Sequence, residues 1–494
     1  MKLLSAKQFQ EWDAFTISHE PISSIDLMER AALLCSEYIE KNFSIETSIK
    51  VFCAKGNNGG DGLAIARQLI GRGYSVTVFI LELGKSGSQD FQSNLHQLHS
   101  FTTDIHFIQR AEAFPLIQET DLLIDALFGT GLNAALNGLS QELVQFMNLS
   151  AAKIISIDIP SGLYVDQSSK GNTIIKAHTT LSFQALKLCF LAAENADFFG
   201  KVVVLNIKLQ MEFLKAEVTN YELLEKANVK LLFKERDAFS HKGKFGHALL
   251  IAGSMGKMGA AILSARAAMR SGLGLLTVSM PAYAEAEMNA ALPEAMLLIR
   301  EKELIDFEKF SSIGIGPGLG TDSNAEEILK TVIDHYKKPI LLDADAITVL
   351  SKHPDWLTKL STDSILTPHP KEFDRLFGES ANEFERWQKA VHLSEKYPLI
   401  ILVKGHHTLI AAKGKGWFNC TGNVGLAKAG SGDSLSGMMT ALLAQGYAST
   451  VAAILAVFLH GSAADLALAS QSTESLLASD TIERIGDAFK DLVQ

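Results

Sequence analysis

Hydrophobic and polar positions in the first half of the chain alternate in blocks, as they do where strands and helices follow one another. Ile49–Ala54 is a short β-rich run, Leu63–Ile70 is apolar at helical spacing, and Tyr74–Leu81 is again strand-like. A strand, a helix and a second strand of this combined length form a βαβ unit. Further strands are predicted at 121–127, 153–159, 179–183 and 202–207.

This alternation stops between 211 and 235, where Glu and Lys are frequent and no strand pattern is strong. We therefore predict a first domain at 1–214, a linker at 215–224 and a second domain at 225–494. The second domain resumes the alternation, with strands predicted at 247–253, 274–278, 312–315, 339–342, 364–367 and 399–403. Alanine-rich helices are predicted at 259–272, 434–445 and 452–470, and the last two should pack together. The predicted fold class is α/β, with two three-layer α/β/α domains.

The composition describes a globular chain with a large core. The 494 residues are 47% hydrophobic and 20% charged, and this length suits two to three domains. The net charge of −10, with no cluster of Lys and Arg, argues against a nucleic-acid partner. An anionic ligand would therefore be held by local groups such as loop amides and helix ends.

The cysteine pattern and the first residues of the chain indicate the cellular compartment of the protein. The four cysteines lie far apart without a Cys-x-x-Cys motif, which favours a reducing compartment and excludes the usual zinc sites. The first residues lack the apolar core of a signal peptide, and the longest apolar candidate, 451–460, is too short for a membrane span. We expect a soluble cytoplasmic protein with no membrane partner.

One short segment, Ala429–Gly437, combines an anion site with a carboxylate. Gly430, Ser431 and Gly432 leave their amides accessible just before a predicted helix, and a helix N-terminus favours a phosphate. Asp433 should repel that phosphate, so its presence suggests a chemical role: taking the proton from a hydroxyl that receives a phosphoryl group. The alternative is an ordinary glycine-rich turn with an N-cap aspartate.

Polar, glycine-rich turns also follow three strands of the first domain. They are Gly56–Gly62, the segment from Asp125 to Leu132, and Asp158–Gly162. The tandem glycines of the first turn should let the backbone approach a ligand closely. Oxygen atoms of Asn58, Asp125 and Ser161 would form a site for a hard cation. Ordinary capped turns are the alternative at each strand end.

These motifs (Gly-Asn-Asn-Gly-Gly-Asp-Gly, Asp-Ala-Leu-Phe-Gly-Thr-Gly-Leu and Ile-Asp-Ile-Pro-Ser-Gly) make residues 1 to about 210 resemble the NAD(P)H-hydrate epimerase domain. The resemblance implies a Rossmann-like fold that interconverts the R and S forms of hydrated NADH and NADPH (NADHX and NADPHX). It also implies a potassium ion held by Asn58, Asp125 and Ser161. The implied hydrate contacts are Asn57, Asn58, Gly59, Gly60, Asp61, Gly129, Thr130, Gly131, Leu132 and Asp158.

Epimerisation at a carbon that carries a hydroxyl next to nitrogen needs a proton donor and acceptor. Asp158 is the candidate, and Lys187 either assists it or is an ordinary solvated lysine. Relatives often carry Arg or Pro after Leu132, where this chain has Asn133-Ala134-Ala135. Phosphate contacts in this loop are therefore expected to come from amides alone.

Six ordered motifs make residues from about 225 to 494 resemble ADP-dependent NAD(P)H-hydrate dehydratase, a branch of the ribokinase-like superfamily. They are Gly253-Ser254, Gly314–Gly320, Leu342–Ala346, Thr367–Pro370, Val403–Thr408 and Gly430–Asp433. The resemblance implies that Asp433 activates the hydroxyl of the hydrate, and that the amides of Gly430, Ser431 and Gly432 bind the transferred phosphoryl group. It further implies nucleotide contacts at Lys404, Gly405, His406, His407, Thr408 and Gly432, and hydrate contacts at Ala261, Gly318, His369 and Asp433. Magnesium and ADP are the expected cofactor and co-substrate.

Several residues of this domain keep a second interpretation. His369, between two prolines, is either a ligand contact or part of a rigid turn. Asp343 and Asp345 either bind magnesium or cap a turn. His406 and His407 should point in opposite directions on an extended chain, which makes a shared metal improbable. Lys371 stands where relatives usually have glycine, so the pocket edge gains a positive charge.

Together these observations favour a bifunctional metabolite-repair enzyme whose partners are NADHX, NADPHX and ADP, and which forms a homo-oligomer. The alternative is a small-molecule kinase for a vitamin or sugar with an attached nucleotide-binding domain. A scaffold with an inactive first domain would be expected to have lost Asn58, Asp125 or Ser161, and all three are present.

Overall fold

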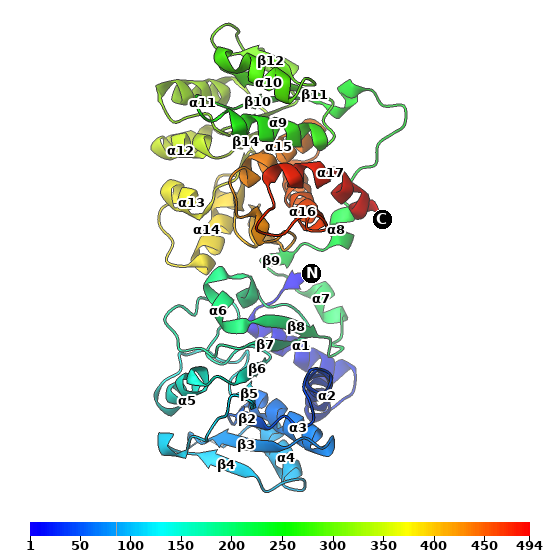
Figure 1. Cartoon of the computed structure of the whole chain (residues 1–494), viewed down its shortest axis with the longest axis vertical. Helices are drawn as coiled ribbons and strands as arrows, with labels where there is room; N and C mark the ends of the chain where they lie inside the picture. The colour runs from blue at the N-terminus through cyan, green and yellow to red at the C-terminus, as the bar shows by residue number, and fades with distance from the viewer. Residues whose placement is uncertain (85) are drawn as a thin grey trace. The chain divides into compact units, whose positions relative to one another are not determined.

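The computed structural model describes residues 1–84 and 86–494, which form two compact units (Figure 1). The N-terminal unit is mainly Lys2–Thr219, and the C-terminal unit is mainly Asn220–Gln494. Each unit has a sheet with helices on both faces, so the predicted pair of α/β domains is confirmed. Residues 215–224, predicted as a linker, carry the end of α7 (Glu212–Ala216) and the strand β9 (Tyr221–Leu223), which pairs with β18 (Lys415–Asn419).

The sheet of the N-terminal unit is parallel and runs in the order β4-β3-β2-β5-β6-β7-β8. Its strands are β2 (Ile49–Cys53), β3 (Val76–Leu81), β4 (Ile105–Ile108), β5 (Leu122–Ala126), β6 (Lys153–Ile157), β7 (Thr179–Phe183) and β8 (Lys201–Leu205). This is the strand order of the doubly wound Rossmann fold, in which the order reverses between the first strand and its neighbour. Ligands bind at that reversal, which lies here between β2 and β5.

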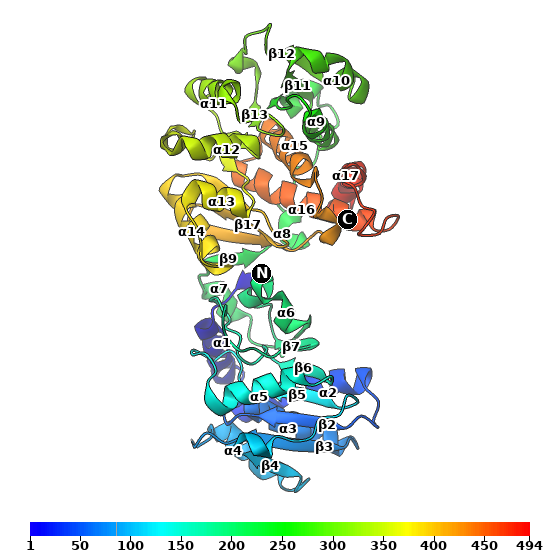
Figure 2. The same cartoon turned by 60° about the vertical axis from the view of Figure 1, so that its left-hand side comes forward.

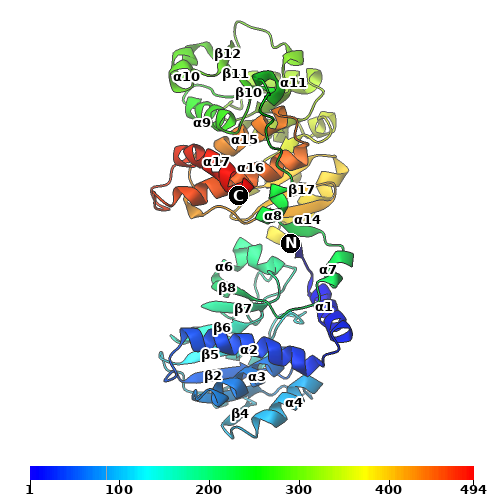
Figure 3. The same cartoon turned by 90° about the vertical axis from the view of Figure 1, so that its right-hand side faces the viewer.

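Helices bury both faces of this sheet. The helices are α1 (Ala6–His19), α2 (Ser24–Asn42), α3 (Asn57–Gly71), α4 (Gln89–Leu98), α5 (Gly138–Leu149) and α6 (Ala196–Phe199); a short strand, β1 (Lys2–Leu3), precedes α1. Val51 of β2 packs with α2, α3 and α4, while its neighbour Phe52 packs with α5, because successive strand side chains point to opposite faces. Figure 3 shows α2 and α3 side by side along one face.

The glycine-rich segment 56–62 was predicted as a loop, but it forms the first turns of α3, with Gly56 as N-cap. A Cβ atom on Gly59 would lie 1.6 Å from the Ala54 carbonyl oxygen, and one on Gly62 would lie 2.7 Å from Cys53 Sγ. These two glycines therefore allow α3 to pack against the end of β2. Glycine at these two positions allows α3 to pack closely, whereas the sequence analysis expected it to allow the close approach of a ligand.

The sheet of the C-terminal unit runs in the order β9-β18-β17-β16-β15-β14-β13-β10-β11-β12. It is parallel from β16 to β12, and β16, β17 and β18 pair antiparallel. The remaining strands are β10 (His247–Ile251), β11 (Leu275–Met280), β12 (Met296–Ile299), β13 (Ser312–Ile315), β14 (Ile340–Leu342), β15 (Ile365–Leu366), β16 (Ile400–Val403) and β17 (Thr408–Ala412).

Two groups of helices cover the faces of this second sheet (Figure 2). One group contains α11 (Ser323–His335), α12 (Asp345–Lys352), α13 (Pro370–Phe377) and α14 (Glu383–Lys396). The other contains α9 (Met258–Arg270), α15 (Ser431–Ala444), α16 (Ser449–Ala467) and α17 (Ala478–Val493); α8 (Lys226–Lys230) and α10 (Glu285–Ala291) are shorter. The predicted strands and alanine-rich helices of this domain are confirmed within a few residues, whereas α17 was not predicted.

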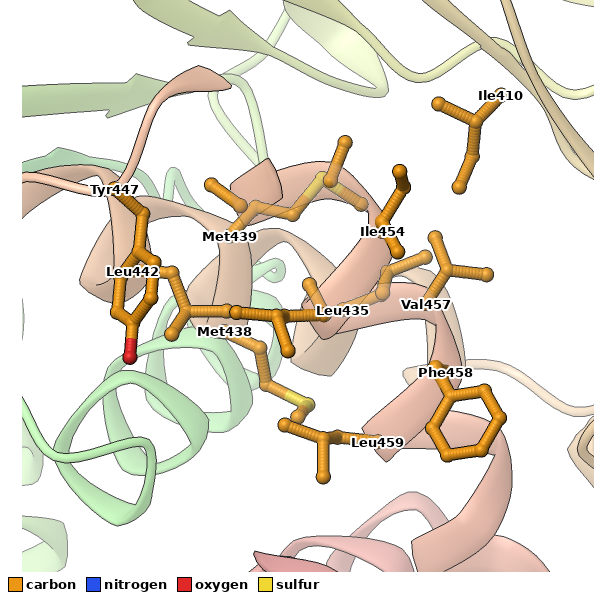
Figure 4. Packing of buried hydrophobic residues seen from close by; sticks show 14 of the residues in the cluster. Ile410, Leu435, Met438, Met439, Leu442, Tyr447, Ile454, Val457, Phe458 and Leu459 are labelled. Atoms are coloured by element: carbon orange, nitrogen blue, oxygen red, sulfur yellow. The ribbon is translucent and has the colours of Figure 1, made fainter. Parts of the chain in front are cut away.

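The predicted packing of α15 against α16 is also confirmed (Figure 4). Leu435, Met438 and Leu442 of α15 share a buried cluster with Ile454 and Leu459 of α16. By length and composition α16 could cross a membrane, which corrects the expectation that no apolar segment is long enough. Because 72% of its apolar window is buried within the protein, it has the character of a core helix.

The contact between α15 and α9 depends on Gly437. A Cβ atom at this position would lie 2.0 Å from the Ser264 carbonyl oxygen of α9, so Gly437→Ala forces the two helices apart. We expect this substitution to lower the free energy of unfolding of the C-terminal unit by about 1–3 kcal/mol. Gly486 of α17 has open space around it, so Gly486→Ala should raise that free energy by about 0.5–1 kcal/mol. Denaturant unfolding of both variants checks this, and equal stability of the two would contradict it.

Candidate active sites

A cavity of about 540 Å³ opens in the N-terminal unit, where β2, β3, β5 and β6 end. It lies at the reversal of strand order, as the topology predicts. The predicted hydrate contacts that line it are Asn57, Asn58, Asp61, Gly129, Thr130, Gly131, Leu132 and Asp158. Gly59 and Gly60, also predicted as contacts, are buried in the first turn of α3.

Asp125, at the end of β5, is fully buried beside Ser161. Its Oδ1 accepts a hydrogen bond from Ser161 Oγ at 2.5 Å, and its Oδ2 accepts bonds from Ser156 Oγ at 2.7 Å and from the Ser161 amide at 2.9 Å. Within the described part of the chain, the hydrogen bonds that Asp125 accepts come from hydroxyl and amide groups alone. Burial raises the pKa of Asp125, and these bonds oppose that rise. Among residues 1–84 and 86–494, this carboxylate thus has no cationic partner.

Asn58 completes this oxygen-rich corner of the cavity. A Cβ atom on Gly129 would lie 3.1 Å from Asn58 Oδ1, so the loop passes close to this side chain. Among the described residues, the buried Asn58 Nδ2 has no hydrogen-bond partner. A buried amide N–H group without a partner indicates a place where a hydrogen-bond acceptor of a bound ligand is expected.

Asp158 follows β6 with a backbone φ of +68°, in the left-handed region. Its Oδ1 lies 2.8 Å from Nζ of Lys187, whose side chain is 1% exposed. Lys187 also donates to Ser182 Oγ at 2.7 Å. Lys187 is therefore buried against Asp158, and the interpretation of Lys187 as a solvated lysine is wrong.

Two carboxyl groups beside Asp158 complete the cavity. Asp61 of α3 was predicted, but Asp13 of α1 was not, although both line the cavity. Burial and the Asp158 charge raise the pKa of Asp13 to about 7, and burial raises the pKa of Asp61 well above its usual range. Asp13 lies on an ordinary amphipathic helix far away in sequence, so nothing local marked it as a site residue.

The second site lies at the N-terminus of α15, which begins at Ser431, three residues before the predicted start. Gly430 is the N-cap, with a left-handed φ of +92°, and the first intrahelical bond runs from the Ser434 amide to the Gly430 carbonyl. The amides of Ser431, Gly432 and Asp433 precede that bond, and the Ser431 amide lies 3.5 Å from the Lys428 carbonyl oxygen, so this helix end is suited to binding an anion. Burial and the Asp343 charge raise the pKa of Asp433 to about 6, while Lys404 opposes the rise.

Lys404 is held beside this helix end by Asp343. Its Nζ lies 2.8 Å from Asp343 Oδ1, and a Cβ atom on Gly432 would lie 3.7 Å from the same Nζ. Asp343 also accepts a hydrogen bond from Thr367 Oγ1 at 2.7 Å and one from Ser436 Oγ. The positive charge of Lys404 lowers the pKa of Asp343 against the effect of burial. Asp343 therefore positions the lysine, a function that the sequence analysis missed.

The other predicted hydrate contacts lie at helix ends of the same unit. His369 is the N-cap of α13, and its Nδ1 accepts from the amides of Lys371 at 3.1 Å and Glu372 at 3.2 Å. Its ring proton is therefore on Nε2, and the imidazole is about half exposed. Gly318, with a φ of +61°, packs against Lys257 before α9. Ala261 is buried in α9, and contact with a hydrate stays a prediction for these residues.

A cavity of about 320 Å³ adjoins the turn between β16 and β17. Gly405, His406 and Thr408 line it, as does His460 of α16, which was not predicted. Burial lowers the pKa of His460 to about 4, and its Nε2 lies 2.9 Å from Ser434 Oγ of α15. A lone histidine within an apolar helix gave no signal of a site. The rings of His406 and His407 lie 4.5 Å apart edge to face, because a bend replaces the extended chain on which we expected them to diverge.

Asp345 follows Asp343 along the chain and has two partners of its own. Its Oδ2 lies 3.0 Å from Lys257 Nζ and accepts from the Gly320 amide at 2.9 Å. Within the described residues, no group of three or more His, Cys, Asp and Glu side chains could hold a metal ion. Both aspartates thus have protein partners of their own, and magnesium binding by either of them stays a prediction.

The comparisons with known proteins agree on both units. Residues 248–486 match the family NAD(P)H-hydrate dehydratase, and residues 24–189 match YjeF-related protein N-terminus. A bifunctional NAD(P)H-hydrate repair enzyme from Moorella thermoacetica is 33% identical over 518 residues, which cover 100% of this chain and 97% of that protein.

Two solved structures resemble the C-terminal unit. An ADP/ATP-dependent NAD(P)H-hydrate dehydratase from Bacillus subtilis, co-crystallized with ATP and Mg2+, is 34% identical with a TM-score of 0.50, over 54% of this chain and 97% of that chain. A ribokinase-like superfamily protein from Enterococcus faecalis is 29% identical with a TM-score of 0.51, over 56% of this chain and 98% of that chain.

Fold and sites together define an α/β enzyme in which a Rossmann-like domain is joined to a ribokinase-like domain with an anion-binding helix end. The match over the full length of the chain identifies the family within this class. The chain belongs to the family of bifunctional NAD(P)H-hydrate repair enzymes.

Proposed function

We propose that the protein epimerises R and S NAD(P)HX in its N-terminal unit and dehydrates S-NAD(P)HX to NAD(P)H in its C-terminal unit, converting ADP to AMP and phosphate. The main support for this proposal is the presence of two separate sites with different chemistry. One is a cavity with several carboxyl groups, and the other is a helix N-terminus that holds a carboxylate and a lysine. A vitamin or sugar kinase would account for the second site but leaves the first without a function.

In the dehydratase site, Asp433 takes the proton of the ring hydroxyl as that oxygen attacks the terminal phosphorus of the nucleotide. The amides at the start of α15 and the Lys404 ammonium stabilise the negative charge of the transferred group. Phosphate is a better leaving group than hydroxide, so its elimination from the ring restores the dihydronicotinamide. Asp343 keeps the ammonium of Lys404 close to this position.

Potassium is proposed for the epimerase site, and the residues present fit it. Asn58, Asp125 and Ser161 would hold the ion through amide, carboxylate and hydroxyl oxygens, which suit a hard cation. The ion would offset the charge of the buried Asp125 carboxylate. Bound there, it would supply a fixed positive charge to the epimerase site.

The remaining proposals concern the nucleotide, the oligomeric state and the cellular compartment of the protein. We infer that Lys404, Gly405, His406, His407, Thr408 and Gly432 contact the nucleotide, which brings Mg2+ on its phosphates. The Bacillus subtilis relative is named for ADP or ATP use, and we propose ADP as the co-substrate here. A cytoplasmic homo-oligomer without nucleic-acid or membrane partners is the proposed setting.

Purified protein supplied with S-NADHX tests the nucleotide assignment. We expect ADP to give NADH with one AMP and one phosphate per turnover, and chromatography of the nucleotides checks the ratio. Starting from R-NADHX, exchange of K+ for Li+ should slow NADH formation while leaving the rate from S-NADHX unchanged. Faster NADH formation with ATP than with ADP would contradict the ADP assignment, and equal rates in both salts would contradict the potassium site.

A further inference from the structure

The first turns of α1 bring an additional carboxyl group to the epimerase cavity. Phe9 and Asp13 are four residues apart, so they lie on the same face of this helix. The Phe9 ring lies 4.7 Å from Lys187 Nζ, the atom that pairs with Asp158. A Cβ atom on Gly131 would lie 3.7 Å from Nε2 of Gln10. This face of α1 therefore covers the Asp158–Lys187 pair and the adjoining loop, and Asp13 lines the cavity there.

We propose that Asp13 is the second proton-transfer residue of the epimerase, acting with Asp158 on the hydrated ring; this inference rests on the proposed epimerase function. Inversion at the hydroxyl-bearing carbon needs a proton for the departing oxygen and an acceptor for the proton of the water that replaces it. One carboxyl group cannot serve both faces of the ring at once. Of the three carboxyl groups that line the cavity, Asp13 and Asp158 come from separate elements, α1 and the turn after β6.

Inversion in one direction of the reaction requires two proton transfers. Asp13, in its acid form, protonates the ring hydroxyl, the C–O bond breaks, water departs, and the ring nitrogen lone pair forms a C=N bond. A water molecule then adds to the opposite face of the same carbon, and its proton passes to the Asp158 carboxylate. The configuration is inverted, one proton has moved from Asp13 to Asp158, and exchange with solvent restores both groups.

The surroundings of Asp13 suit this exchange better than those of Asp61. The pKa of Asp13 is raised to about 7, so both of its forms are populated near neutral pH. Burial and the Asp158 charge raise the pKa of Asp61 well above its usual range, which favours the acid form of this group. The charged groups that interact with Asp13 are Asp158, Lys187 and Asp61, and Lys55 lines the same cavity.

Asp13→Asn tests the assignment. We expect a loss of at least about a hundredfold in the conversion of R-NADHX, measured as NADH formed by the variant's own C-terminal unit at saturating ADP, with an unchanged rate on S-NADHX. Glu11→Gln is the matched control, because Glu11 is a more exposed carboxylate on the same helix that pairs with Lys7. The control should convert R-NADHX at the wild-type rate.

A pH profile separates proton transfer from a structural role. The wild-type epimerase rate should fall as the pH rises above about 7, because Asp13 then loses the proton that it donates. The residual rate of Asp13→Asn should lack this fall. An Asp13→Asn rate within threefold of wild type (about 0.7 kcal/mol), or a loss confined to Asp61→Asn, would overturn the inference. A wild-type protein that does not convert R-NADHX at all would instead refute the proposed epimerase function.

Discussion

Asp433→Asn is expected to lower the rate of dehydration by about a thousandfold, because the amide cannot accept the proton of the attacking hydroxyl. The substitution keeps the size of the side chain and leaves the Asp343–Lys404 pair and the first turn of α15 in place. We therefore expect nucleotide binding to be little changed and the epimerase activity to be intact. NADH formation from S-NADHX with ADP measures the loss.

Asp480→Asn is the matched control for this variant. It removes a carboxylate from the first turn of α17, another helix of the same unit, and should keep the wild-type rate. The pH dependence gives a second check: the pKa of Asp433 is raised to about 6, and only its ionised form accepts a proton. The wild-type rate should thus fall as the pH drops below about 6. Undiminished dehydration by Asp433→Asn would remove this residue from the mechanism.

Asp158→Asn should abolish the epimerase activity while dehydration of S-NADHX continues. Asparagine tolerates the positive φ at this position, so the backbone should keep its path. The amide cannot take up the proton of the incoming water, and it leaves the buried Lys187 ammonium without its carboxylate. We expect the conversion of R-NADHX to fall by about 10²–10⁴-fold.

Loss of a buried ion-pair partner also destabilises a protein, by about 3–5 kcal/mol, so activity loss alone would be ambiguous. The double variant Asp158→Asn with Lys187→Met removes both charges and should recover most of that stability in thermal unfolding. It should remain without epimerase activity. Recovery of the activity together with the stability would show that Asp158 serves the fold and does not transfer protons.

Residues that follow strands directly were predictable, because parallel strands bring their carboxyl ends to one edge of the sheet. Asp158 after β6 and the Gly129 loop after β5 line one cavity for this reason. Gly432 and Asp433 were predictable because small residues with a carboxylate before an apolar helix form a local signal. The structure places both residues in the first turn of α15.

Long-range pairs and the packing of glycines were not predictable from local patterns. Lys404 and Asp343 are 61 residues apart, and nothing in either segment indicates that the two side chains meet. Asp13 reaches the cavity only because α1 packs over Lys187. Gly59 carries a low helix propensity, which predicted a loop, but tertiary contact with Ala54 outweighs that preference.

We expect one chain to repair both the R and the S form of the hydrate. The most direct measurement is the near-ultraviolet absorbance of NADH formed from a mixture of R- and S-NADHX, first with ADP and then with ATP. Full conversion of the mixture with ADP, faster than spontaneous epimerisation allows, is the predicted result. Conversion that stops at the S fraction, or no NADH with either nucleotide, would contradict the account.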